Sequence, residues 1–106
     1  MSVAEERRAA RNFLAGYSLM SARELAGFLG IGESSASRLL ETGRVPSINT
    51  GSGAQRQHLK VDPLDAAVYA LAEREGLSIA EYWSQHGEAT VDHARRFIER
   101  RRRFLG

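Results

Sequence analysis

The amino-acid sequence predicts a mainly α-helical protein with one small β-hairpin. Short apolar stripes at helical spacing recur along the chain, and glycines or capping residues bound most of them. The period of the apolar residues changes to two only between Ile48 and Val61, on either side of a glycine-rich stretch. The length of 106 residues fits one ordinary domain, or a small domain with an extension.

The composition is typical of a soluble intracellular protein. Apolar residues make up 42% of the chain and charged residues 26%, which allows a modest core and argues against disorder. The chain has no cysteine, so disulfides and thiolate metal sites are excluded. No apolar run approaches the roughly 20 residues of a membrane span, and the N-terminus lacks the apolar stretch of a signal peptide. We therefore expect a cytoplasmic protein with no membrane partner.

The formal net charge of +2 is unevenly distributed. Residues 61–91 carry one arginine against six acids, whereas residues 92–106 carry six arginines against two acids. A basic front, an acidic middle and a basic tail suggest that one surface meets a polyanion. Solvated faces of ordinary helices explain the same pattern equally well.

The first twenty residues are expected to contribute an N-terminal helix, over about residues 3–15. An apolar stripe at helical spacing supports it, and Gly16 is expected to end it. The residues of this stripe are Ala10, Phe13, Leu14 and Tyr17.

Two short helices joined by a glycine turn are expected next. Ser21 and Glu24 have the spacing of a capping box at the start of the first helix, and Gly30 is expected to end it. The second helix is expected to start at Gly32 or Glu33 and to run to about Thr42, and Ile31 is expected to fill the angle between the two helices. This order indicates a helix-turn-helix. The positions expected to be buried are Leu25, Phe28, Leu29, Ala36, Leu39 and Leu40.

A hairpin and a third helix complete a winged helix-turn-helix over residues 21–76. Ile48 and Leu59 belong to the two expected strands, and the glycines of the tip at residues 51–53 allow the positive φ angles of a tight turn. Asp62 followed by proline is a strong helix start. The buried stripe expected for this helix is Leu64, Ala67, Val68, Leu71 and Ala72, and Gly76 is expected to end it.

Residues 77–106 are expected to form a C-terminal helical extension. A second capping box at Ser78 opens a short helix, and a last helix follows over roughly residues 89–104. Val91, Ile98 and Leu105 are seven residues apart, which is the spacing of a dimer seam. The alternative is a stripe that folds back on its own domain.

Four motifs follow one another in residues 22–46. They are Ala-Arg-Glu-Leu-Ala from Ala22, Leu-Gly-Ile from Leu29, Ser-Ser-Ala-Ser-Arg-Leu-Leu from Ser34 and Gly-Arg-Val-Pro from Gly43. With the hairpin and the capped third helix, this ordered set resembles the excisionase-like, MerR-type winged helix-turn-helix family. The resemblance covers about 40% of the chain, residues 21–64.

The resemblance implies sequence-specific binding of double-stranded DNA, with a recognition helix in the major groove and a wing on the backbone or minor groove. The family includes phage and mobile-element excisionases (recombination directionality factors), small transcriptional regulators and phage packaging subunits. The resemblance also implies a bacterial or phage-encoded protein that is associated with the nucleoid. Its expected protein partners are a second copy of itself, in a dimer or a side-by-side oligomer, or an integrase or another protein. The chain departs from the pattern at Gly32 in place of a capping serine, and at Ser37 in place of an aromatic residue. It also departs in the wing, at residues 55–57.

The predicted DNA-binding residues lie on the second helix, on the wing and beside them. Arginine grips guanine with two hydrogen bonds, and lysine and arginine hold phosphates without reading sequence. The helix residues are Glu33, Ser34, Ser35, Ser37 and Arg38; the wing residues are Ser52, Gln55, Arg56, Gln57 and His58; the flanking residues are Arg44 and Lys60. The alternatives are serines that only solvate the helix start, an ion pair between Arg38 and Glu41 or Glu33, and a wing that is an ordinary surface hairpin.

The arginine run at the C-terminus is a candidate second basic contact, a partner site or a solvated helix end. Its members are Arg100, Arg101, Arg102 and Arg103.

The sequence offers no catalytic or metal-binding pattern. The pair Gly51 and Gly53 lacks the third glycine and the following helix of a dinucleotide site, and His58, His86 and His93 do not have the spacing of metal ligands. We expect no enzyme activity, no cofactor and no metal. The alternative function is that of an assembly adaptor, such as a small terminase-like packaging subunit that acts through protein contacts.

Overall fold

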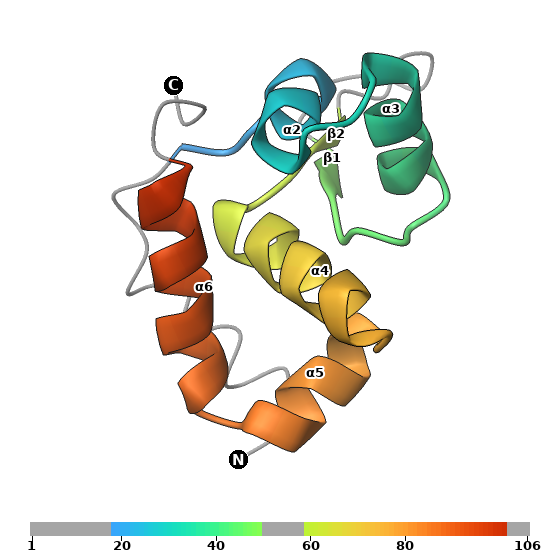
Figure 1. The fold of residues 1–106 in the computed structure, drawn as a ribbon. Helices are drawn as coiled ribbons and strands as arrows, with labels where there is room; N and C mark the ends of the chain where they lie inside the picture. The colour runs from blue at the N-terminus through green and yellow to red at the C-terminus, as the bar shows by residue number, and fades with distance from the viewer. Residues whose placement is uncertain (1–17, 50–58, 102–106) are drawn as a thin grey trace.

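The computed structural model describes residues 18–49 and 59–101, and this part of the chain is mainly helical with a small antiparallel sheet (Figure 1). This matches the predicted fold class at the level of secondary structure. The elements are α2 (Ala22–Leu29), α3 (Glu33–Glu41), β1 (Ile48–Asn49), β2 (Leu59–Lys60), α4 (Pro63–Glu75), α5 (Ile79–His86) and α6 (Ala89–Arg100). The helix predicted over residues 3–15 and the hairpin tip at residues 51–53 lie outside the described residues.

The predicted capping box opens α2. The Glu24 amide donates to Ser21 Oγ at 3.2 Å, and the Ser21 amide donates to Glu24 Oε1 at 3.1 Å, so two amides at the helix start are satisfied. Gly30 ends the helix in the left-handed region at φ 71°. The apolar face is buried as predicted at Leu25 and Phe28, whereas Leu29 is half-buried.

Ile31, between α2 and α3, does not fill the angle between the helices. Its amide donates to the Ala26 carbonyl at 2.9 Å, but the residue is 37% exposed. The prediction for this side chain is wrong, because the buried space between α2 and α3 is occupied by residues of the helices themselves, including Ala36 and Leu40.

Helix α3 starts at Glu33, one of the two predicted start positions. Its N-cap Gly32 makes no side-chain cap, which follows from the absence of a capping oxygen. Ala36 and Leu40 are buried, whereas Leu39 is only half-buried.

The sheet pairs Ile48 with Lys60 and Asn49 with Leu59 in antiparallel register. A contact that the sequence analysis did not predict extends this sheet by one bridge. The Met20 and Val61 amides donate to each other's carbonyl oxygens at 2.8 and 2.9 Å. Both side chains are fully buried, so the segment before α2 belongs to the core.

The central helix α4 begins at the predicted cap, where the Leu64 amide donates to Asp62 Oδ1 at 2.9 Å. Its first half is buried on almost every side rather than along one stripe: Asp65, predicted only as an acid of the first turn, is 1% exposed. Helix α4 therefore lies at the centre of the described fold, and α2, α5 and α6 all pack against it.

The C-terminal helices fold back onto this centre. Helix α6 packs mainly against α4, and the rings of Phe28 and Phe97 meet edge to face with centroids 5.3 Å apart. Ile98, one residue of the heptad row, is fully buried in the same core as Leu25. Within the described residues the row packs inward, and Ile98 is not available to a dimer seam.

No helix of residues 18–49 and 59–101 is long and apolar enough to cross a membrane.

Candidate nucleic-acid interface

The outer face of α3 is open to solvent. Glu33, Ser34, Ser35 and Arg38 are all exposed, and Ser37 is half-buried. Among the described residues, no salt bridge joins Arg38 to either of the acids considered as its partners. The face therefore presents hydroxyl groups and one guanidinium toward solvent.

Ser37 and Lys60 come together from different elements. Both line a hollow of about 260 Å³ that also includes Ser21 at the start of α2 and Glu41 near the end of α3. Lys60 brings a positive charge beside the inner edge of α3. The carboxylate of Glu24 offsets the partial positive charge at the start of α2, and the carboxylate of Glu41 opposes the charge of Lys60.

Arg44 is held by an acid of the central helix. Its Nη2 donates to Glu73 Oε1 at 3.3 Å, and the two side chains are 62% and 50% exposed. Burial and the neighbouring Glu73 raise the pKa of Tyr69, and Arg44 opposes that shift. Arg44 thus lies between α3 and the sheet, and the carboxylate of Glu73 partly neutralises its charge.

The residues predicted to form a wing all lie outside the described residues; they are Ser52, Gln55, Arg56, Gln57 and His58. Of the predicted hairpin, only the strands Ile48–Asn49 and Leu59–Lys60 are described. Helix α3 and these strands lie at the opposite end of the molecule from α5 (Figure 1).

The described arginines of the C-terminal run, Arg100 and Arg101, have different surroundings. Arg101 Nη1 donates to the Phe28 carbonyl at 3.1 Å, and its guanidinium carbon lies 5.3 Å from the centre of the Phe97 ring. Arg101 therefore joins α6 to α2. Arg100 is exposed on α6, and Arg102 and Arg103 lie outside the described residues.

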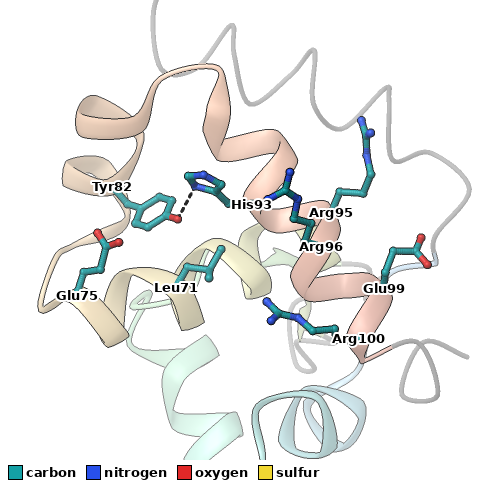
Figure 2. Close-up of a pocket in the computed structure, with 8 residues that line it drawn as sticks. All are labelled: Leu71, Glu75, Tyr82, His93, Arg95, Arg96, Glu99 and Arg100. Carbon is teal, nitrogen blue, oxygen red and sulfur yellow. Dashed lines mark hydrogen bonds between the residues drawn. The ribbon is translucent and has the colours of Figure 1, made fainter.

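A cavity lies along α6, away from α3. It has a volume of about 660 Å³, and Figure 2 shows Arg96 and Arg100 on α6 facing the same space as Leu71 of α4. A hydrogen bond of 2.8 Å joins the Tyr82 hydroxyl to His93 Nδ1 at its wall. Arg100, predicted as part of a second basic contact, thus lines a cavity on a different surface from the exposed face of α3.

A ring cluster beside this cavity ties α4, α5 and α6 together. His86 Nε2 donates to Glu75 Oε2 at 3.0 Å, and the His86 ring lies 4.3 Å from that of Tyr82 and 5.2 Å from that of His93. Burial, followed by Glu75, raises the pKa of Tyr82, which keeps its hydroxyl protonated. Sequence reasoning missed this cluster, because each of its hydrogen-bonded pairs joins two helices and is eleven residues apart in the chain.

Among the described residues there is no group of three histidine, cysteine, aspartate or glutamate side chains that could hold a metal ion.

In comparisons with known proteins, no family model matches the chain, and no curated protein or solved structure is significantly similar to it.

Proposed function

We propose that this chain is a sequence-specific double-stranded DNA-binding protein of the winged helix-turn-helix type, and that α3 is its recognition helix. An excisionase or a small transcriptional regulator is the kind of protein that this reading favours. The observation that carries the proposal is the order of elements: two helices at a tight turn, a two-stranded sheet and a capped third helix.

The open face of α3 supports this role. An α-helix fits the major groove of B-DNA, and exposed serine and arginine side chains are suited to base edges. Arg38 has the reach for a bidentate contact with guanine, and Ser34 and Ser35 have the groups for base or phosphate contacts. Glu33 repels phosphate, but it is able to accept a hydrogen bond from cytosine N4.

The flanking cations support backbone contacts beside that helix. Arg44 belongs to the step directly after α3 and Lys60 to the return strand of the sheet, so both cations follow α3 in the chain. Contacts of this type position a protein on DNA and make binding sensitive to salt. The wing, with Arg56, is proposed to add contacts in the minor groove or on the backbone.

The packing of the C-terminal helices favours DNA binding over the assembly adaptor. Helix α6 uses Phe97 and Ile98 for the internal core, and α5 uses Tyr82 and Trp83. These apolar side chains are therefore not available for self-assembly.

The proposal is tested by a mobility shift with a random duplex at low salt, followed by selection of bound sequences from a random pool. We expect a complex whose affinity falls as salt is added, because each neutralised phosphate releases counterions. Absence of any shift at micromolar protein would overturn the proposal.

Three arginine variants separate base reading from phosphate contact. Arg38→Ala is expected to relax the sequence preference, by about 1–3 kcal/mol at the contacted base pair. Arg56→Ala is expected to weaken binding of all sequences. Arg96→Ala, an exposed arginine on α6, is the matched control and is expected to leave both properties unchanged. Uniform losses from the first two variants would limit Arg38 to a phosphate contact.

A further inference from the structure

A groove with a mixed polar and apolar lining lies where α2, α3, α4 and α6 meet, behind the turn between α2 and α3. Its volume is about 330 Å³, and charged side chains of Glu73, Arg74 and Arg101 stand among its lining residues. The apolar lining consists of Leu29, Ile31, Leu39, Tyr69, Ala70 and Phe97.

Most of this apolar lining remains in partial contact with water. Leu29, Leu39, Tyr69 and Ala70 are only half-buried, and Ile31 is 37% exposed. Covering such a surface with apolar side chains is favourable, since the gain scales with the apolar area removed from water. The groove is thus suited to one or two large apolar side chains.

The size of the groove favours a tethered occupant over a free partner. A stable complex between separate proteins buries about 1,200–2,000 Å² in total, far more than a groove for one or two side chains offers. A segment on the same chain needs much less contact, because a short tether gives it an effective concentration in the millimolar range.

The described part of the chain ends at this groove. Arg101 is its last residue and is also one of the lining residues, fixed by its hydrogen bond to the Phe28 carbonyl. The sequence continues with Arg102 and Arg103 and then with two large apolar residues, Phe104 and Leu105. Three extended residues span about 10 Å, so Phe104 has the reach to enter the groove from Arg101.

We propose that Phe104 and Leu105 dock in this groove of their own chain and cover Leu29, Ile31 and Leu39. Docking seats the C-terminal residues against the turn that joins α2 to α3. The proposal does not depend on DNA binding, and its test uses no DNA.

The test measures how fast a thiol placed in the groove reacts with a maleimide. The natural chain has no cysteine, so Ile31→Cys introduces a single reporter. Its labelling rate is compared with that of the same protein carrying Phe104→Ser and Leu105→Ser. If the tail occupies the groove about 90% of the time, the serine pair speeds labelling about tenfold, which corresponds to about 1.4 kcal/mol.

The chain offers a matched control in Ile48→Cys. Ile48 is 38% exposed, close to the 37% of Ile31, but it lies on β1 and does not line the groove. Its labelling rate is expected to be the same with and without the serine pair. Equal acceleration at both positions would indicate a general loss of structure and would overturn the proposal, as would no acceleration at Ile31→Cys.

Protein concentration distinguishes the chain's own tail from that of a second copy. Labelling of Ile31→Cys is expected to be independent of protein concentration, because the docking is intramolecular. A rate that falls as the protein is concentrated would assign the groove to a second copy and overturn the proposal.

Discussion

The guanidinium of Arg44 and the carboxylate of Glu73 lie 3.3 Å apart and tie the segment after α3 to the central helix. If Arg44 binds phosphate, Glu73 competes with DNA for it. We therefore expect Glu73→Gln to strengthen DNA binding by up to about fivefold, because an exposed ion pair contributes about 0–1 kcal/mol. The measurement is a titration of duplex DNA by fluorescence anisotropy. Glu88→Gln removes the same charge from an exposed position at the start of α6 and is expected to have no effect.

The capping box of α5 is expected to contribute measurably to stability. In this box the Glu81 amide donates to Ser78 Oγ at 3.1 Å. Ser78→Ala should lower the free energy of unfolding by about 0.5–2 kcal/mol, as N-cap replacements do. Urea unfolding measures the loss, and Ser84→Ala, an exposed serine on the same helix, is the control. Equal effects from the two variants would contradict a capping role.

The same box predicts a dependence on acid pH. The hydrogen bonds from Ser78 lower the pKa of Glu81 in the folded state. A carboxyl group with a depressed folded pKa stabilises the protein above its unfolded pKa, and this contribution is lost as the pH falls through the folded value. The stability of the natural chain and that of Glu81→Gln, which lacks the carboxylate charge, should therefore converge on acidification below about pH 4. A gap that is constant across urea unfolding curves from pH 7 to pH 3 would contradict this.

Two half-buried or buried tyrosines predict a loss of stability at alkaline pH. The pKa of Tyr69 and that of Tyr82 are both raised in the folded state, primarily by burial. Their contribution is complete below the unfolded pKa of about 10 and is lost as the pH rises through the folded values. Replacing both by phenylalanine should flatten the decline in stability between about pH 9.5 and pH 11. The decline would remain unchanged if other groups caused it.

Gly76 is expected to be required for its backbone angle rather than for space. It ends α4 at φ +70°, and a Cβ added there would meet nothing within 4 Å. Gly76→Ala should therefore lower stability by about 1 kcal/mol through backbone strain alone. Gly76→Asn should cost less, because asparagine tolerates the left-handed region better. Thermal unfolding of the two variants tests this order, and equal losses would contradict it.

Phe97 is expected to hold the C-terminal helices on the rest of the fold. It contacts Phe28 and lies beneath the guanidinium of Arg101. Phe97→Ala should lower the free energy of unfolding by about 3–5 kcal/mol, and Phe97→Leu should lower it less. A small effect of Phe97→Ala, measured by urea unfolding, would indicate that α6 is only loosely attached.

Features encoded within a few residues were predictable from the sequence. The caps at Ser21 and Ser78 are examples, because each box is complete within four residues. The exposure of Ser34, Ser35 and Arg38 on α3 also followed from its pattern, since they lie away from the buried positions of Ala36 and Leu40, whereas Ser37 is half-buried beside them.

Features that join distant segments were not predictable in this way. The bridge between Met20 and Val61 has no local signal, because α2, α3 and the sheet lie between the two residues in the chain. Arg101 looks like its neighbours in an arginine run, and only the packing of α6 against Phe28 distinguishes its role. The exposure of Ile31 likewise depends on how closely the two helices approach each other.

The paired hydrogen bonds between Met20 and Val61 join the two ends of residues 21–60, so this segment forms a closed ring. Helices α2 and α3 and both strands of the sheet lie inside this ring. Such a closed unit is expected to open and exchange its amide hydrogens cooperatively, with the Met20 and Val61 amides among its slowest. Its two ends also lie next to each other, which makes it a segment that could be transplanted into another scaffold as a cassette.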